Sequence, residues 1–211
     1  MLINETEAYD WISEKGVHGW MTRLESRAHF LCAKSVPLGG KIVEIGSYHG
    51  ASSIVLAAGS VAGNRVPVYA VDPHIGQIYT NSGDTYDSTD QTTWYSNVVI
   101  SGLAQLICAI KLPSVNAARA FDDESVDLLY IDGCHFYEAV AADLAAWIRV
   151  LRPGALVLMH DRLEHGVERA IKDRPSGYIK VGYIDGLAVL ANYWIGKHWP
   201  LDKIEGLIRW E

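Results

Sequence analysis

A short loop between residues 44 and 50 has the composition of a ligand-binding turn. The acid Glu44 follows a short apolar run, and the glycines Gly46 and Gly50 precede a second apolar stretch. A strand that turns through glycines into a helix presents backbone N–H groups and a positive helix end to a ligand. Glycine also lets the ligand approach the backbone, because it has no Cβ. We therefore expect a ligand at this junction.

The residues between the two glycines argue against a dinucleotide. A dinucleotide-binding turn has the pattern Gly-x-Gly-x-x-Gly, whose middle glycine makes room for a pyrophosphate, whereas this turn carries Ser47, Tyr48 and His49. S-Adenosylmethionine is an alternative ligand for such a turn, because it has no phosphate. Its cationic portion would be suited by the acid Glu44. Asp72, which ends the next apolar run, is placed to accept hydrogen bonds from both ribose hydroxyls. The alternative is a purely structural turn in which Asp72 caps a helix.

A second group of titratable residues follows two later apolar runs. Asp132 and His135 come after residues 126–131, and Asp161 comes after residues 155–159. Side chains of these types can act as general acids or bases, and paired carboxylates can bind magnesium. The alternative is again structural, because His135 and Asp161 could each cap the helix that follows.

Alternating strands and helices must position these groups. Apolar runs bounded by Gly, Pro and Asp predict strands, and apolar residues at helical spacing predict helices. Thr22-Arg23-Leu24-Glu25 fits a capping box at the start of a helix that ends near Pro37. Strands are expected at residues 41–45, 66–71, 106–110, 126–131 and 155–159, and helices at 51–62, 115–121 and 136–151. A further helix is expected to begin in the last part of segment 74–93 and to run through Trp94 to Leu103.

The end of the chain differs in kind, since residues 178–184 and 187–193 flank Asp185-Gly186, the sequence of a type I′ hairpin turn. Parallel strands joined by helices and closed by one antiparallel hairpin make a doubly wound α/β fold. We predict a Rossmann-like, mostly parallel seven-stranded sheet with a C-terminal antiparallel hairpin.

One domain is expected over residues 1–211, because no repeat or linker interrupts the pattern. It would consist of an N-terminal helical cap (1–40), a core (41–193) and a tail (194–211) rich in tryptophan, which would suit packing on the body or a homodimer. The polar segment 74–93 is longer than an idle loop usually is, so we expect a lid or substrate loop there.

Composition narrows the class of partner. The formal net charge is -7, and Lys and Arg form no dense cluster. We therefore do not expect nucleic acid as the substrate. No run of about 18 apolar residues predicts a membrane span. The three cysteines are scattered and resemble the reduced thiols of a cytoplasmic protein. An uncharged small molecule or a saccharide is the expected substrate.

Several motifs together resemble the class I S-adenosylmethionine-dependent methyltransferases. The similarity covers residues from about Gly19 to about Tyr193, and its nearest branch contains small-molecule and sugar O-methyltransferases of the macrolide-tailoring and cephalosporin-hydroxylase-like type. It rests on Val43-Glu44-Ile45-Gly46-Ser47-Tyr48-His49-Gly50-Ala51-Ser52, on Asp72, on Ile131-Asp132-Gly133-Cys134-His135-Phe136-Tyr137, and on Leu151-Arg152-Pro153-Gly154 with His160-Asp161.

The resemblance implies methyl transfer from S-adenosylmethionine and a set of residues around that cofactor. Residues 19–22 are similar to the stretch that these enzymes fold over it. In the family's strand order the first and fourth strands are neighbours, which brings Asp132 and His135 beside the Gly46 turn. The cofactor-binding residues implied are Glu44, Gly46, Ser47, Tyr48, Gly50, Ser52, Asp72, Asp132, Trp20 and Met21.

Methyl transfer to a hydroxyl requires the loss of the hydroxyl proton. His135 or Asp132 could accept that proton as a general base. Alternatively, Asp132 and Asp161 could hold Mg²⁺, which would acidify the hydroxyl. Related metal-dependent enzymes have Asp or Asn after the second acid, whereas this chain has Arg162, whose charge disfavours a metal there.

Two rival functions remain at this level. A dinucleotide-dependent oxidoreductase is disfavoured by the missing middle glycine of the turn. A scaffold that binds S-adenosylmethionine without turnover would need the cofactor residues but not His135.

Overall fold

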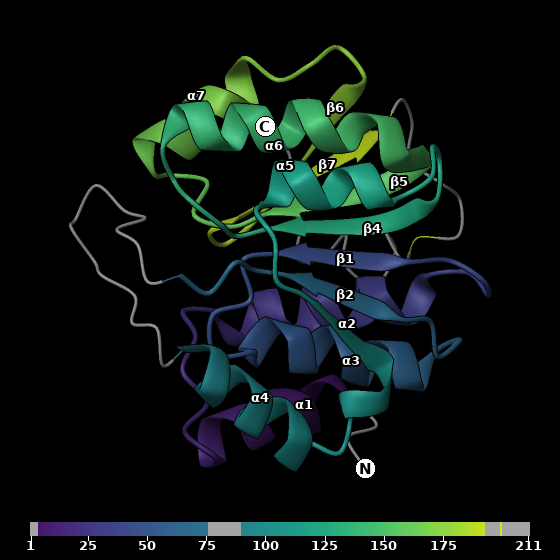
Figure 1. Ribbon diagram of the computed structural model, residues 1–211, viewed down its shortest axis with the longest axis vertical. Coiled ribbons are helices and arrows are strands. Elements are labelled where there is room, and N and C mark those ends of the chain that lie inside the picture. The colour runs from purple at the N-terminus through teal and green to yellow at the C-terminus, as the bar shows by residue number, and fades with distance from the viewer. Residues whose placement is uncertain (1–3, 76–89, 193–198, 200–211) are drawn as a thin grey trace.

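The computed structural model describes residues 4–75, 90–192 and 199. These residues form a seven-stranded sheet with helices on both faces (Figure 1). The strands are β1 (Ile42–Ile45), β2 (Val68–Val71), β3 (Ile107–Ile110), β4 (Val126–Ile131), β5 (Leu151–Met159), β6 (Tyr178–Ile184) and β7 (Leu187–Asn192). The α-helices are α1 (Glu5–Glu14), α2 (Arg23–Ser35), α3 (Ala51–Ala62), α4 (Asp90–Ile100), α5 (Ser114–Ala117), α6 (Tyr137–Trp147) and α7 (His165–Lys172), with 3-10 turns η1 (Ala104–Leu106), η2 (Ala118–Ala120) and η3 (Ile148–Val150).

The strands lie in the order β3-β2-β1-β4-β5-β7-β6. The five strands from β3 to β5 are parallel, and β7 runs antiparallel to both of its neighbours. The predicted fold class is therefore confirmed, including the closing hairpin. Because β1 lies between β2 and β4, the order reverses beside β1, and ligands of open α/β sheets bind at such a switch point.

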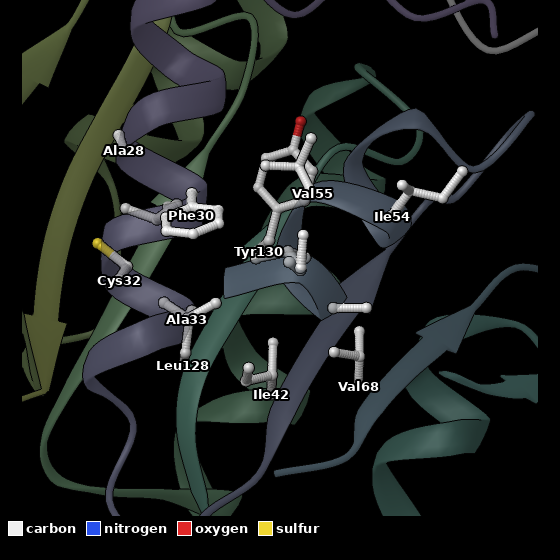
Figure 2. Packing of buried hydrophobic residues seen from close by; sticks show 14 of the residues in the cluster. Ala28, Phe30, Cys32, Ala33, Ile42, Ile54, Val55, Val68, Leu128 and Tyr130 are labelled. Carbon is white, nitrogen blue, oxygen red and sulfur yellow. The ribbon is translucent and has the colours of Figure 1, made fainter. Parts of the chain in front are cut away.

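Each face of the sheet carries its own apolar core. Helices α1 to α4 cover one face and α5 to α7 cover the other (Figure 1). Alternate residues of β4 point to opposite sides, so Leu128 packs toward α2 and α3 while Leu129 packs toward α6. Figure 2 shows the first of these cores, built from side chains of α2, α3, β1, β2 and β4. Burial on both faces explains why β1 and β4 are apolar almost throughout.

Helix α2 begins at the predicted capping box. The Thr22 side chain accepts the Glu25 N–H, and the Glu25 carboxylate accepts the Thr22 N–H at 2.7 Å. The same carboxylate accepts the Gly186 N–H at 2.8 Å. The cap therefore also ties α2 to the turn between β6 and β7.

Two local predictions are wrong. The helix predicted at 136–151 ends earlier, because Leu151 already pairs with Val126 in the sheet and begins β5. The Asp185-Gly186 turn is not type I′, which needs positive φ at both central residues. Asp185 has a φ of 49°, but Gly186 does not have a positive φ; its N–H and C=O are instead held by Glu25 and by the Arg162 N–H.

The segments predicted as a loop and a tail are described only at their borders. Most of the predicted 74–93 loop lies outside the described residues, and α4 begins at Asp90. In the tail, Trp199 is buried, and its indole N–H donates to the Gly154 carbonyl at 2.8 Å. None of the helices in the described part of the chain has the length and hydropathy to cross a membrane.

Candidate functional site

A cavity of about 580 Å³ opens at the carboxyl ends of the parallel strands. The loops that follow β1, β2, β3, β4 and β5 all contribute to its wall, together with the segment before α2 and one side of α6. Nine of the ten predicted cofactor residues and all of the predicted catalytic and metal residues either line it or belong to the loops around it. Those that line it are Trp20, Met21, Gly46, Ser47, Tyr48, Ser52, Asp72, Asp132, His135 and Asp161.

The two glycines of the first loop are required by packing within the protein. Gly46 has a φ of 83°, and a Cβ there would lie 2.2 Å from the Asp132 carbonyl oxygen. Gly50 has a φ of 89°, and a Cβ there would lie 3.2 Å from the Trp94 ring. We expected glycine here to admit a ligand to the backbone; the structure shows instead that Gly46 admits the loop after β4.

Asp72 fixes the shape of the first loop. Its Oδ2 accepts the N–H groups of Ser47 at 2.9 Å and Tyr48 at 3.1 Å, and its Oδ1 accepts the His74 N–H at 2.8 Å. The Ser47 and Tyr48 N–H groups are therefore not free for a ligand, contrary to expectation. A carboxylate has about four acceptor sites, so Asp72 retains capacity for a ligand hydroxyl.

Glu44 lies beneath the cavity and is not part of its wall. Its side chain is fully buried, and its Oε2 accepts the Ser53 hydroxyl. Burial raises the pKa of Glu44 to about 8, against which hydrogen bonds from Ser52 and Ser53 act. Burial thus disfavours the negative charge that we expected Glu44 to offer the cationic part of a cofactor.

The N-terminus of α3 faces the cavity without a side-chain cap. Gly50 is the N-cap residue and has no side chain, and Ala51 and Ser52 line the cavity. A helix N-terminus attracts anionic groups such as a carboxylate. Beside it, the Ser47 hydroxyl is buried and makes no hydrogen bond to the described residues, so it offers a partner to a polar ligand.

Aromatic side chains stand at one side of the cavity. The Trp20 ring lies 5.2 Å from the Tyr48 ring, which stacks on His49 at 3.7 Å. His49 Nε2 lies 3.0 Å from Asp90 Oδ1 at the start of α4. The contact of Trp20 with Tyr48 is consistent with the prediction that residues 19–22 fold over a ligand.

The groups after β4 and β5 converge. His135 Nε2 lies 3.2 Å from Asp161 Oδ2 and 3.9 Å from Asp132 Oδ1. One donor atom from each of these three residues lies within 4.8 Å of the other two. Asp161 has a φ of 50°, a strained conformation for a residue with a side chain, and such strain is common at functional sites.

His160 and Glu25 complete this cluster, and sequence reasoning missed both. His160 Nδ1 lies 3.0 Å from Asp161 Oδ2 and 3.4 Å from Asp132 Oδ1, and its Nε2 lies 3.4 Å from Glu25 Oε2. The place of His160 beside Asp161, at the end of an apolar strand, could have indicated its role in the cluster. Nothing in the sequence spacing of Glu25 indicates the role of Glu25.

Opposing effects set the charges of the cluster. Burial alone would lower the pKa of His160, but Asp132, Asp161 and Glu25 outweigh it and hold that pKa far above its ordinary value. Burial would raise the pKa of Asp132, but the His160 charge and hydrogen bonds from His135 and Tyr130 lower it. The Tyr130 hydroxyl donates to Asp132 Oδ2 at 2.7 Å. Asp132 is therefore ionised and held between two histidines and a tyrosine.

The pKa of His135 is raised in the same way. Burial would lower it, but the hydrogen bond to Asp132 and the charge of Asp161 have the larger combined effect. The arrangement stabilises the protonated imidazole, so His135 can accept a substrate proton only where it is neutral, and the neutral fraction grows as pH rises.

Arg162, whose charge is expected to disfavour a metal, contacts residues of the β6–β7 hairpin. Its Nε donates to the Asp185 carbonyl at 2.9 Å, and its guanidinium lies 3.8 Å from the centre of the Tyr183 ring. The guanidinium thus packs on the β6–β7 hairpin.

Comparisons with known proteins agree with this architecture. A family model described as a methyltransferase domain matches residues 43–162. Uncharacterized protein y4gI of Sinorhizobium fredii is 34% identical over 132 residues, which cover 60% of this chain and 14% of that protein. The chain therefore spans only a small part of that relative's length.

Solved structures with a similar fold include two methyltransferases. A methyltransferase from Geobacter sulfurreducens has a TM-score of 0.62 at 17% identity, with 90% of this chain and 89% of that chain covered. An O-methyltransferase from Bacillus cereus in complex with SAH has a TM-score of 0.57 at 16% identity, with 89% of this chain and 90% of that chain covered.

Proposed function

The chain belongs to the family of methyltransferase domains, and we propose that it transfers a methyl group from S-adenosylmethionine to a hydroxyl oxygen of a small molecule or saccharide. One observation carries the proposal. A single cavity joins the Asp72 loop and the N-terminus of α3 to the cluster of Asp132, His135 and Asp161. Its volume of about 580 Å³ lies in the range of small-molecule sites.

The wall of the cavity fits S-adenosylmethionine better than a dinucleotide. Asp72 keeps acceptor capacity for ribose, and the uncapped α3 N-terminus with the Ser47 hydroxyl suits a carboxylate and an amine. Among the described residues that line the cavity there is no Lys or Arg to face a pyrophosphate. When bound, the cofactor supplies an electrophilic methyl group on its sulfonium.

We assign His135 as the base that takes the acceptor's proton, at Nε2. The carboxylates of Asp132 and Asp161 then stabilise the imidazolium. Asp132 would also face the cationic sulfonium, because Gly46 brings the loop after β4 against the cofactor loop.

A bound cation is a second way to activate the hydroxyl, and the convergence of three donor atoms favours it specifically. Asp132 and Asp161 would hold Mg²⁺ through carboxylate oxygens, with His135 as a third donor, and His160 would have to give up the positive charge that it carries beside both carboxylates. A cation there would lower the pKa of a bound hydroxyl. The two proposals differ in what His135 does, since it cannot ligate through Nε2 and accept a proton there at the same time.

Calorimetry tests the cofactor. We expect S-adenosylmethionine and S-adenosylhomocysteine to bind with a one-to-one stoichiometry and NAD to give no heat of binding. Binding of NAD in preference to S-adenosylmethionine would support the rival oxidoreductase and contradict the proposal.

Transfer of a radiolabelled methyl group to a panel of phenols and saccharides tests the reaction. In His135→Ala we expect turnover to fall by about 100-fold or more, the usual scale for a lost general base, while cofactor binding stays close to wild type. His165→Ala, on the exposed start of α7, is the matched control. Unchanged turnover in His135→Ala would remove His135 from the mechanism, and cofactor binding without transfer to any acceptor would favour the scaffold.

Dialysis against a chelator separates the base from the cation. If Mg²⁺ acts at Asp132 and Asp161, activity is lost on chelation and returns with Mg²⁺, and Asp161→Asn weakens Mg²⁺ binding measured by calorimetry. Full activity in chelator leaves the base alone as the mechanism.

A further inference from the structure

The wall of the cavity contains a buried acid that the proposed reaction does not use. Asp143 lies on α6 and is only 7% exposed, yet it lines the cavity together with Ala139 and Ala142 of the same helix. Ser114, at the start of α5, lines the same wall. This wall is formed by the loop after β3 and by α6.

A chain of hydrogen bonds fixes the Asp143 carboxylate. The Trp147 indole N–H donates to the Ser114 oxygen at 2.8 Å. The Ser114 hydroxyl is thereby free to donate its own proton to Asp143, with which it makes a side-chain hydrogen bond. Since Trp147 is fully buried one turn along α6, the orientation of the serine is set by the core.

A further hydrogen-bond donor would stabilise the ionised carboxylate of Asp143. Burial raises its pKa to about 6, and the bond from Ser114 only partly offsets that cost. No Lys or Arg among the described residues lines the cavity, so no cation compensates the carboxylate from that side. A buried carboxylate is costly unless its acceptor sites are filled; a ligand N–H facing this wall would fill one.

The exocyclic amino group of adenine is the hydrogen-bond donor of the cofactor that remains to face this wall. The amino-acid portion goes to the α3 N-terminus, the ribose to Asp72 and the sulfonium to Asp132, as the proposed function requires. The base, attached to the opposite side of the ribose from the sulfonium, then meets the remaining wall. That wall presents Val115, Ala139 and Ala142 to an aromatic ring and the Asp143 oxygen to its edge.

We propose that Asp143, oriented by Ser114 and Trp147, accepts a hydrogen bond from the exocyclic amine of the cofactor's adenine and makes the cavity select adenine over bases that lack this donor. The inference rests on the proposed function, because it takes the cofactor to be S-adenosylmethionine. It assigns a specificity-determining residue, not one that acts on the transferred methyl group.

Calorimetry with two ligands tests the assignment. S-Adenosylhomocysteine carries the amine, and S-inosylhomocysteine carries a carbonyl oxygen in its place. At pH 8, where Asp143 is ionised, we expect wild type to prefer S-adenosylhomocysteine by roughly 10-fold or more, the scale of a hydrogen bond to a charged group. In Asp143→Asn the preference should fall to within about 2-fold, because the amide can donate to the carbonyl of the inosine base.

Two further variants make the result unambiguous. Glu138→Gln changes the same charge at an exposed position of α6 and should retain the wild-type preference. Ser114→Ala leaves the carboxylate but removes its positioning bond, so an intermediate preference is expected; it also serves as the test if Asp143→Asn does not fold.

Three outcomes overturn the inference. Equal binding of both ligands by wild type, or a full preference retained in Asp143→Asn or, where that variant does not fold, in Ser114→Ala, shows that Asp143 does not select adenine, while cofactor binding itself stands. Failure of wild type to bind either ligand removes the proposed function as well, and so is distinguishable from failure of the inference alone.

Discussion

The acids around the cavity differ in charge because their neighbours differ. Asp132 is kept ionised by His160, His135 and Tyr130. Glu44, on the adjoining strand β1, has hydroxyl partners in Ser52 and Ser53, and burial favours its neutral form. Neighbouring acids whose pKa values differ can play different roles. Here Asp132 is ionised and available for catalysis, whereas Glu44 supports the loop from below.

The neutral state of Glu44 makes stability depend on pH. Its pKa is ordinarily 4.5 and is raised to about 8 in the fold. Between these values the unfolded chain has released the proton and the folded chain retains it, so the free energy of unfolding falls as pH rises, by up to about 1.4 kcal/mol per pH unit. Glu44→Gln cannot ionise, and its stability should lack this decline.

Urea unfolding of wild type and Glu44→Gln from pH 6 to pH 9 measures the difference. We expect the variant to gain on wild type steadily up to about pH 8, where the Glu44 pKa lies, and to gain nothing more above it. Parallel curves for the two proteins would show that Glu44 is already ionised in the fold.

At the scale of elements, the site depends on the close approach of two loops. Gly46 combines a φ of 83° with a position in which a Cβ would meet the Asp132 carbonyl at 2.2 Å. Gly39 has a similar φ of 80°, but nothing lies within 4 Å of its Cβ position. The pair separates the cost of backbone conformation from the cost of the loop contact.

We expect Gly46→Ala to lower the free energy of unfolding by about 2–5 kcal/mol, from conformation and overpacking together. Gly39→Ala should cost only about 1–2 kcal/mol, from conformation alone. Thermal and urea unfolding of both variants measure this. Equal losses would mean that the loops after β1 and β4 separate without penalty.

Glu25 joins helix α2 to the β6–β7 turn. Its carboxylate accepts hydrogen bonds from the N–H groups of Thr22 and Gly186 and faces His160. In Glu25→Gln, one of these acceptor positions becomes a donor, leaving a buried group unpaired. We expect a loss of about 1–3 kcal/mol in the free energy of unfolding. Glu14→Gln on the exposed end of α1 is the control.

Hydrogen exchange locates the effect of Glu25→Gln. Protection should fall at Gly186 and along the β6–β7 hairpin before it falls in β1. Uniform loss of protection across the sheet would mean that Glu25 contributes to the core in general and does not clamp the hairpin.

For the whole molecule, the elements with strong local patterns could be predicted from sequence. β4 matches its predicted bounds because its apolar run is uninterrupted, and α3 matches because glycines stand at both of its ends. The hairpin turn type was mispredicted because Glu25, 161 positions from Gly186, decides the conformation of Gly186. Local sequence cannot contain that contact.

The same limit applies to the site. Asp72, Asp132, His135 and Asp161 each follow an apolar strand, and parallel strands deliver their carboxyl ends to one edge. His160, Glu25 and Asp143 were not found, because their roles come from contacts between α2, β5 and α6 that no spacing within one element reveals. Glu44 was selected for its negative charge, which its burial in the fold disfavours.

We propose that the cavity holds one S-adenosylmethionine between Asp72 and Asp132. A crystal structure with S-adenosylhomocysteine and magnesium tests it most directly. We expect the ribose hydroxyls to bind Asp72, the sulfur to face Asp132 and His135, and the adenine to lie against Asp143. Density for the nucleoside outside the cavity, or a ribose that makes no contact with Asp72, would contradict it.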